Sequence, residues 1–234
     1  QGYLVVALAV ALLGLFVLVP KAASGEAPWF ARLLVVALAV KAGAALFRLY
    51  WGFEVKEGIA DAAGYHGAGR VIANSIRHLE FSQVPLYLQP GTEFVKLFTG
   101  FVYAAIGPTL LGGYLFFSAL AFAGCVLYYK AFRVAFPEGD RGLYALLAFL
   151  YPSWVYWPSS IGKDATLALM IAMVAYGAAV VFRHNRLHGW VLLALGLAGV
   201  TMVRPHVAAL LGVALACGLV LGPPRRPRSS LALV

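Results

Sequence analysis

Long apolar runs recur along almost the whole chain, and they are continuous rather than alternating with polar residues. A run of about 17 to 25 apolar residues is long enough to cross the hydrocarbon core of a bilayer as a helix. Alternating apolar and polar residues would instead indicate the strands of a membrane barrel. The pattern therefore predicts an all-α protein that crosses a membrane several times.

Seven runs are predicted to span the bilayer, so that the chain forms a polytopic transmembrane helical bundle. They are Gly2–Val19, Ala31–Phe47, Thr109–Tyr129, Leu143–Trp157, Ala165–Phe182, Trp190–Val203 and Val207–Leu221. Residues 1–234 are accordingly interpreted as a single transmembrane domain. The last four residues are apolar again, as if a further segment were beginning, and we expect the chain to be part of a longer protein.

A long loop with one ambiguous apolar segment separates the second predicted span from the third. The segment Phe94–Gly107 has only about 14 residues, which is short for a span and typical of a helix lying at the membrane surface. Pro108 should separate it from the next span, because proline cannot continue a helix with full backbone bonding. We therefore interpret residues 48–107 as an outer loop that carries interfacial helices.

Basic residues are unequally divided between the two sides that this arrangement defines. One side holds Lys21, Arg32, Lys130, Arg133, Arg141, Arg183, Arg186, Arg225, Arg226 and Arg228. The short loops of the opposite side hold only Lys163 and Arg204. Because basic loops stay in the cytoplasm, the first side is predicted to be cytoplasmic. If Phe94–Gly107 spanned the bilayer, Lys21 and Arg32 would move outside and the bias would weaken.

The composition agrees with a membrane protein. Of the residues, 62% are hydrophobic and 12% are charged, whereas a soluble domain carries about 25% charged residues. The net charge of +9 would suggest nucleic acid as a partner of a soluble protein. Here the Lys and Arg residues lie between apolar runs, as in cytoplasmic loops, so we expect membrane lipids as partners and no nucleic acid.

The first candidate for chemistry is a carboxylate in the outer loop. Residues 58–79 are predicted to form a helix that could lie on the bilayer surface through one mildly apolar face. That face carries Asp61, Tyr65, Ala68 and Ile72. A partly dehydrated Asp61 can act as a base toward a hydroxyl group. Alternatively, Asp61 is a first-turn carboxylate stabilised by the helix dipole. His66 is close by, although most such histidines simply lie at the surface.

Two short turns on the same predicted side carry further charges. Lys163 and Asp164 form a pair at the edge of a span, where charges are costly to bury without partners. Taken singly, Asp164 could stabilise a helix start and Lys163 could extend to the headgroups. The turn Arg204-Pro205-His206 holds either an interfacial anchor or a phosphate ligand, since the planar arginine fork can bind two oxygens.

We expect Asp61, Lys163, Asp164 and Arg204 to converge on one outward-facing cavity, because charges at membrane depth tend to face water or each other. Lys41 lies within the second span and either faces a partner or extends to the headgroups.

No Cys/His spacing typical of a metal site is present. The sequence therefore predicts no metal ligands and no cofactor, while a divalent ion is left open.

Four short motifs follow one another in a characteristic order. They are Asp-x-x-x-Tyr-His at Asp61–His66, a short apolar helix at Phe94–Gly107, Leu-Tyr-Pro-Ser-x-Val-x-Trp-x-Ser-Ser-x-x-Lys-Asp at Leu150–Asp164, and Val-Arg-Pro-His at Val203–His206. This order resembles the GT-C superfamily of membrane glycosyltransferases. The resemblance covers about residues 31 to 222 and is to the bacterial branch similar to protein mannosyltransferases and lipid A aminoarabinose transferases.

The resemblance implies a catalytic carboxylate in the first long outer loop, which matches Asp61. It also implies transfer of a sugar from a polyprenyl-phosphate donor at the outer face of a bacterial inner membrane. Many members have two adjacent acidic residues at the catalytic position, whereas Ala62 follows Asp61 here.

In this hypothesis Arg204 and Lys163 hold the leaving phosphate, and Asp164 orients Lys163 or the acceptor. His66 and His206 are further candidates for substrate contacts. The alternative function is a non-catalytic integral membrane subunit that keeps a glycosyltransferase-like fold and joins other membrane subunits in a larger assembly.

Overall fold

A computed structural model of the chain describes residue 20 and residues 23–55, 61–81 and 84–221. Every regular element within these residues is helical, which confirms the predicted all-α class. The predicted span Gly2–Val19 lies outside the described residues, and so do the basic residues after Leu221.

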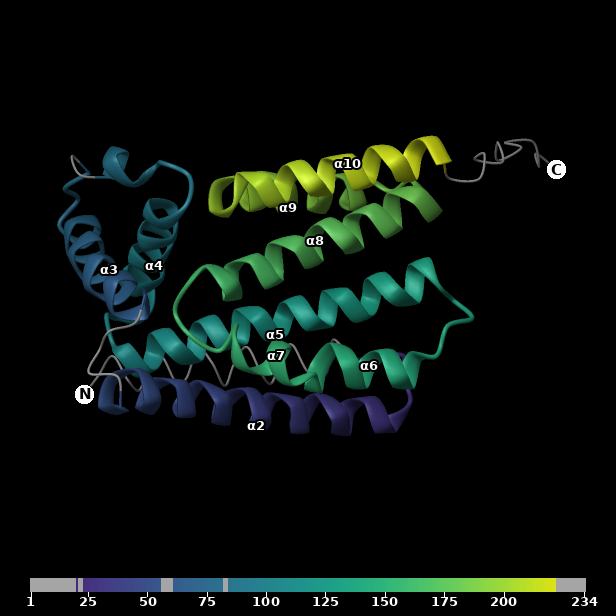
Figure 1. The fold of residues 1–234 in the computed structure, drawn as a ribbon, viewed down its shortest axis with the longest axis horizontal. Coiled ribbons are helices and arrows are strands. Elements are labelled where there is room, and N and C mark those ends of the chain that lie inside the picture. The colour runs from purple at the N-terminus through teal and green to yellow at the C-terminus, as the bar shows by residue number, and fades with distance from the viewer. Residues whose placement is uncertain (1–19, 21–22, 56–60, 82–83, 222–234) are drawn as a thin grey trace.

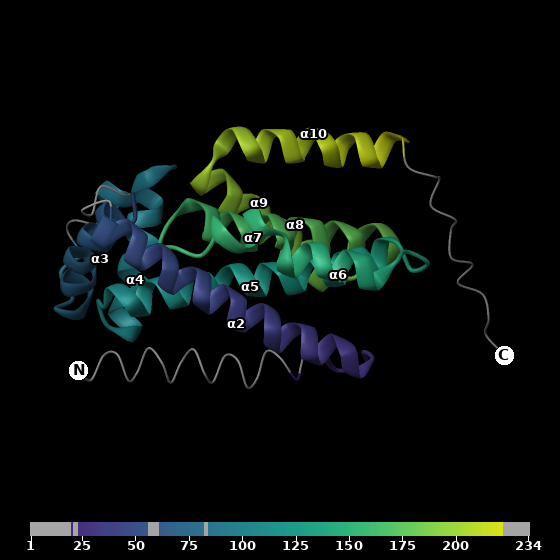
Figure 2. The same cartoon turned by 60° about the horizontal axis from the view of Figure 1, so that its bottom comes forward.

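Five of the described helices run along the molecule and are called the long helices here, and a pair of helices lies across one end of them (Figure 1). The long helices are α2 (Pro28–Tyr50), α5 (Leu110–Ala135), α8 (Lys163–His184), α9 (Leu187–Val203) and α10 (Pro205–Leu221). The pair at the end is α3 (Asp61–Arg77) and α4 (Thr92–Ile106). Figure 2 shows the same end from another side, with α3 and α4 again next to the end of α2 and the start of α5. Two short helices, α6 (Arg141–Leu150) and α7 (Pro152–Tyr156), follow α5.

Three helical segments of the described chain are long and apolar enough to cross a bilayer: Pro28–Val55, Leu110–Ala135 and Lys163–His184. The first of them is α2 with a π-helical turn, Trp51–Val55, added to its end. Helices α9 and α10 are also apolar, but each has 17 residues, at the lower limit for a span. These lengths support a multi-pass membrane protein, and the full set of seven spans stays a prediction.

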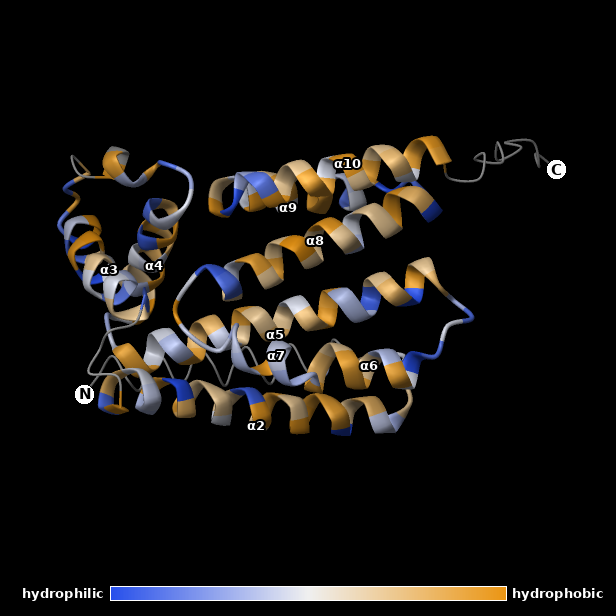
Figure 3. Cartoon of the chain, in the orientation of Figure 1, coloured by the Kyte–Doolittle hydropathy of each residue, from blue (hydrophilic) through white to orange (hydrophobic). Residues whose placement is uncertain are grey.

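The surface of the long helices is apolar. Helix α10 has no buried residue, and Leu210, Val213 and Val220 are each more than half exposed. Figure 3 shows hydrophobic residues along the long helices and hydrophilic residues in the loops at both ends. Soluble proteins rarely expose continuous apolar surface of this extent, so this surface is suited to contact with lipid chains.

Glycines bring the backbones of α5, α8 and α9 close together. A Cβ atom added at Gly124 of α5 would lie 2.7 Å from the carbonyl oxygen of Ala168 in α8. A Cβ atom at Gly196 of α9 would lie 2.8 Å from the carbonyl oxygen of Met170. Membrane helices associate through such small residues because there is little hydrophobic driving force between them in lipid.

Helix α4 corresponds to the predicted helix Phe94–Gly107, shifted by one or two residues. It ends at Ile106 and is followed by Gly107, whose φ of 95° a glycine adopts without strain, and α5 begins at Leu110. The predicted break between these two helices is therefore confirmed. Because α4 lies across the long helices instead of along them (Figure 1), its orientation is compatible with an interfacial helix.

The predicted span Leu143–Trp157 is not one continuous helix. Helix α6 ends at Leu150, Tyr151 has an extended backbone with φ −60° and ψ 125°, and α7 begins at Pro152. A proline ring disfavours the helical conformation of the residue before it, which accounts for the break at Tyr151. The division leaves α7 as a short separate helix next to α2.

A lysine side chain of α2 donates a hydrogen bond to a backbone carbonyl group at the end of α7. In a continuing helix the Trp154 carbonyl would accept from residue 158, but Pro158 has no N–H. Lys41 of α2 donates to this carbonyl instead, at 3.1 Å. The Lys41 side chain is only 1% exposed, so it has a partner inside the bundle and does not extend to the headgroups.

We expect Lys41→Met to lower the thermal stability of the purified protein. Methionine keeps an unbranched apolar stem but leaves the Trp154 carbonyl unpaired, and an unsatisfied buried acceptor costs about 1–3 kcal/mol. The Tm in detergent would be compared with that of Arg32→Met, which removes an exposed charge from the same helix. Equal Tm values for the two variants would contradict a structural role for the Lys41 hydrogen bond.

Candidate functional site

A polar pocket of about 290 Å³ lies at the end of the long helices where α3 and α4 are placed. Its walls come from the end of α2, the start of α3, the start of α5, the connection from α7 to α8, and the end of α9. The structure brings the four charged residues of the predicted cavity together on these walls: Asp61, Lys163, Asp164 and Arg204. They come from three distant parts of the chain.

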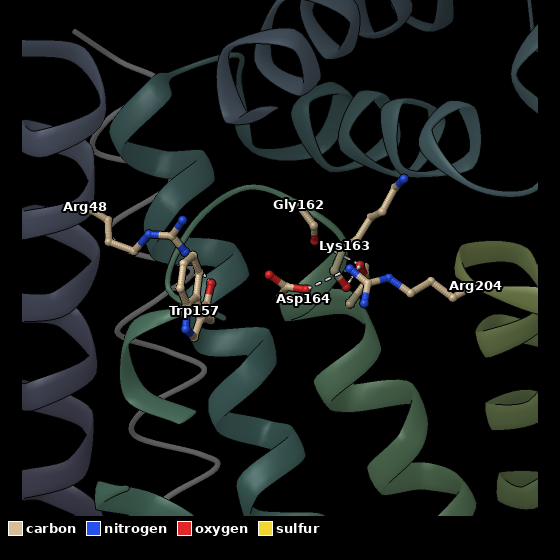
Figure 4. A network of polar contacts seen from close by, with 7 residues as sticks. Arg48, Trp157, Gly162, Lys163, Asp164 and Arg204 are labelled. Atoms are coloured by element: carbon tan, nitrogen blue, oxygen red, sulfur yellow. Dashed lines mark hydrogen bonds and ion pairs between the residues drawn. The ribbon is translucent and has the colours of Figure 1, made fainter. Parts of the chain in front are cut away.

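Asp164 and Arg204 form an ion pair inside this pocket (Figure 4). Arg204 lies between α9 and α10 and donates from Nη2 to Oδ1 of Asp164 at 3.2 Å. Both side chains remain partly exposed, at 41% for Arg204 and 45% for Asp164. An exposed pair is worth only about 0–1 kcal/mol, so an anionic ligand can compete with Asp164 for the guanidinium group.

Lys163 is the first residue of α8 and is half-buried. Its side chain extends away from the Asp164–Arg204 pair (Figure 4), and it has no ion pair with any residue that the structure describes. Thr166 holds the start of α8 by donating to the carbonyl groups of Gly162 and Lys163, each at 3.0 Å. The ammonium group of Lys163 is thus available to a ligand.

Asp61 is the first residue of α3 and is exposed at the pocket. Its position in the first turn of α3 agrees with the interpretation as a helix-start carboxylate, and its role as a base stays a prediction. The expectation that its helix face lies on the bilayer was wrong for part of that face. Tyr65 and Ile72 are buried, and Ile72 packs against Gly100 of α4, where an added Cβ atom would lie 2.4 Å from it. The missing side chain of Gly100 lets α4 cover this face.

Arg48 is a pocket residue that the sequence analysis did not single out. It lies in the last turn of α2 and donates to the carbonyl groups of Tyr156, at 3.3 Å, and of Trp157. Its guanidinium carbon lies 4.9 Å and 5.5 Å from the centres of these two rings. Arg48 and Arg204 approach the pocket from opposite sides (Figure 4). A basic residue at the predicted outer end of a span departs from the positive-inside distribution, and this signal could have revealed it.

Aromatic side chains form much of the remaining wall: Trp51, Tyr65, Tyr114, Tyr156 and Trp157. Burial, and next the nearby Asp61, raise the pKa of Tyr65 above its usual value. Its hydroxyl group therefore stays protonated at neutral pH and can donate a hydrogen bond. Such rings offer flat faces on which a sugar could stack.

The two histidines proposed as substrate contacts are not part of this wall. Nδ1 of His66 lies 2.8 Å from the hydroxyl oxygen of Tyr103 in α4, because five residues along a helix turn the side chain away from the face of Asp61. Burial, and next Arg70, lower the pKa of His66. His206 is exposed in the first turn of α10, outside the pocket.

The charge of the pocket favours an anionic ligand, since Arg48, Lys163 and Arg204 outnumber the carboxylates of Asp61 and Asp164. Among the described residues, no three His, Cys, Asp or Glu side chains gather in a way that could hold a metal ion. No family model, curated protein or solved structure matches the chain. What the pocket can do therefore follows from its own residues and geometry.

Proposed function

We propose that this protein is an integral membrane glycosyltransferase that takes a sugar from a polyprenyl-phosphate donor at the outer face of a bacterial inner membrane. One observation supports this most strongly. A single pocket at the end of apolar helices joins the carboxylate of Asp61 to the cationic groups of Arg48, Lys163 and Arg204. A carboxylate can accept the proton of a hydroxyl group, and cations can bind the donor phosphate.

The proposed reaction inverts the configuration at the sugar. The acceptor hydroxyl group loses its proton to Asp61 while its oxygen forms a bond to the anomeric carbon. The bond between that carbon and the phosphate oxygen breaks, and its electron pair leaves with the polyprenyl phosphate. Arg204 and Lys163 stabilise the negative charge that develops on the leaving phosphate.

Asp164 was expected to orient Lys163 or the acceptor, but its partner in the structure is Arg204. We therefore assign Asp164 the role of orienting Arg204. The contact orients the guanidinium group toward the pocket. Arginine has five N–H donors, and the one bond to Asp164 leaves others for a phosphate. Arg48 contacts two backbone carbonyl groups and keeps the aromatic wall of α7 against α2.

The charge distribution supports the proposed orientation of the chain in the membrane, and the pocket bears on the choice between an enzyme and a non-catalytic subunit. The end of the bundle opposite the pocket carries Lys130, Arg133, Arg141 and Arg183, and by the positive-inside distribution this supports a cytoplasmic position for that end. A non-catalytic subunit would be expected to have the pocket residues packed or covered. The partial exposure of Asp164 and Arg204 means that the chain itself leaves these groups open to a ligand, as the enzyme hypothesis requires.

Binding of the lipid carrier tests this function directly. We expect Arg204→Ala to weaken binding of undecaprenyl phosphate by about 10-fold to 100-fold, because hydrogen bonds to charged groups contribute about 1.5–3 kcal/mol. Arg204→Lys should keep part of the affinity, since a point charge cannot make a two-pronged contact. Titration of the detergent-solubilised protein can be followed by tryptophan fluorescence, because Trp51 and Trp157 line the pocket.

Arg186→Ala provides the matched control, because it removes an exposed arginine far from the pocket. Its affinity should equal that of the unaltered protein. Unchanged binding by Arg204→Ala, with the same Tm as the unaltered protein, would remove the support for a phosphate site.

A further inference from the structure

A second pocket lies at the opposite end of the long helices and is strongly basic. It has a volume of about 630 Å³ and lies where α5 and α8 end and α6 begins; Figure 1 shows these three ends together, away from α3 and α4. Its basic residues are Lys130, Arg133, Arg141, Arg183 and His184. The Asp61 pocket shares none of these residues.

Most of this positive charge has no carboxylate partner. Arg133 forms an ion pair with the buried Glu26, which also accepts a hydrogen bond from Tyr129 at 3.2 Å. Within the described residues, the other basic side chains of the pocket form no ion pair. Bringing several cations to one cavity raises their mutual repulsion, so an anion bound among them would be stabilised.

Two of the arginines are held in place by backbone carbonyl groups. Arg183 donates from Nε to Val134 at 3.3 Å, and Arg141 donates from Nη2 to Pro137 at 3.4 Å. Each guanidinium group has five N–H donors, so most of them remain available to a ligand. The two side chains are therefore positioned at the pocket without being neutralised.

Apolar side chains next to the pocket residues in the chain point to the kind of anion. Phe136, Leu143 and Phe182 are large, exposed and apolar, and they lie at the ends of the same three helices. A free phosphate has no apolar part that could contact these side chains. An anionic lipid fits both the basic pocket and the apolar surface, because its phosphate can occupy the pocket while its chains run along the apolar helices. Basic pockets between membrane helices on the cytoplasmic side are known to bind such headgroups.

We propose that this pocket binds the headgroup of an anionic phospholipid, and that a headgroup with two phosphates, as in cardiolipin, fits it best. Two phosphate diesters, each with one negative charge, can contact Arg141 and Arg183 at the same time, and Lys130 of α5 adds a further positive charge to the pocket. The positive-inside distribution accounts for basic residues in the loops, but it does not require them to surround one cavity. This site is independent of the proposed glycosyltransferase function.

The test uses the full chain, purified in a neutral detergent and stripped of lipid. Cardiolipin, phosphatidylglycerol, phosphatidylcholine and inorganic pyrophosphate are titrated separately, and binding is read as lipid adducts in native mass spectrometry and as a rise in Tm. We expect cardiolipin to bind most tightly, phosphatidylglycerol less tightly and phosphatidylcholine negligibly. Binding should weaken as salt is raised, because exposed charges are screened.

The double variant Arg141→Gln/Arg183→Gln should lose at least about 10-fold in cardiolipin affinity, the loss of roughly one charge-assisted hydrogen bond. The matched control is Arg32→Gln/Arg186→Gln, which removes the same charge from exposed positions outside the pocket and should retain the affinity. If the first variant does not fold, Lys130→Gln takes its place. An equal loss in the control, or pyrophosphate binding as tight as that of cardiolipin, would overturn the proposal.

Discussion

Asp61→Asn is expected to slow sugar transfer by about 10²–10⁴-fold, the usual contribution of a general base. Asparagine has nearly the same shape as aspartate, but its amide cannot take the proton of an acceptor hydroxyl group. Arg204 and Lys163 remain in the variant, so binding of the polyprenyl-phosphate donor should change little. The rate is measured in proteoliposomes as release of polyprenyl phosphate from a donor with a radiolabelled sugar, with membrane extract as the source of acceptor.

Glu80→Gln is the matched control for this experiment, because it neutralises an exposed carboxylate beyond the end of α3 and outside the pocket. It should transfer at the rate of the unaltered protein. If Asp61→Asn also transferred at that rate, Asp61 would not be the base. If none of the proteins consumed any donor while donor binding persisted, the non-catalytic subunit would become the better hypothesis.

Gly124→Ala is expected to destabilise the protein more than any other single methyl addition between α5 and α8. The new Cβ atom would lie 2.7 Å from the carbonyl oxygen of Ala168 and 2.9 Å from its carbonyl carbon. These are backbone atoms, so no side-chain rotation can relieve the contact and the helices must separate. Overpacking typically costs about 1–3 kcal/mol, and Gly124→Leu should prevent folding. The Tm and the elution profile in detergent measure both effects.

Gly43→Ala tests whether this effect belongs to the contact and not to glycine itself. Gly43 lies within α2, and a Cβ atom there would meet nothing within 4 Å. Alanine is favoured over glycine in a helix interior by about 0.8–1.0 kcal/mol, so this variant should be at least as stable as the unaltered protein. A Tm for Gly124→Ala as high as that of Gly43→Ala would show that α5 and α8 do not pack closely at this point.

Local sequence patterns were sufficient to predict where most helices lie, although several ends differ, as for α5, which ends at Ala135 and not at Tyr129. The predicted span Ala165–Phe182 falls within α8, and Thr109–Tyr129 does so in α5 except for Thr109, which caps that helix, because a long apolar run is itself the signal for a membrane helix. Gly107 and Pro108 marked the end of α4, since their effect on the backbone depends only on neighbouring residues. The break at Tyr151 had the same kind of signal in Pro152, although the apolar run around it outweighed that signal in the prediction.

The candidate site was predicted in part. The predicted topology put Asp61, Lys163, Asp164 and Arg204 on one side of the membrane, and in the structure all four line one pocket. The structure does not place His66 there, because five residues along a helix turn its side chain away from the face of Asp61. Only the packing of α4 on α3 gives His66 its partner Tyr103. This packing brings together Gly100 and Ile72, which are 28 residues apart in the sequence.

The sequence by itself determined the all-α class, the apolar helices and the residue types available for chemistry. Only the tertiary structure decided the partners of the charged groups. Lys41 contacts Trp154, 113 residues away, and Arg204 contacts Asp164, 40 residues away. Hydropathy and helical period describe neighbours within about one turn. Contacts between distant residues depend instead on how closely each pair of helices can approach, which is set by the shapes of both faces together.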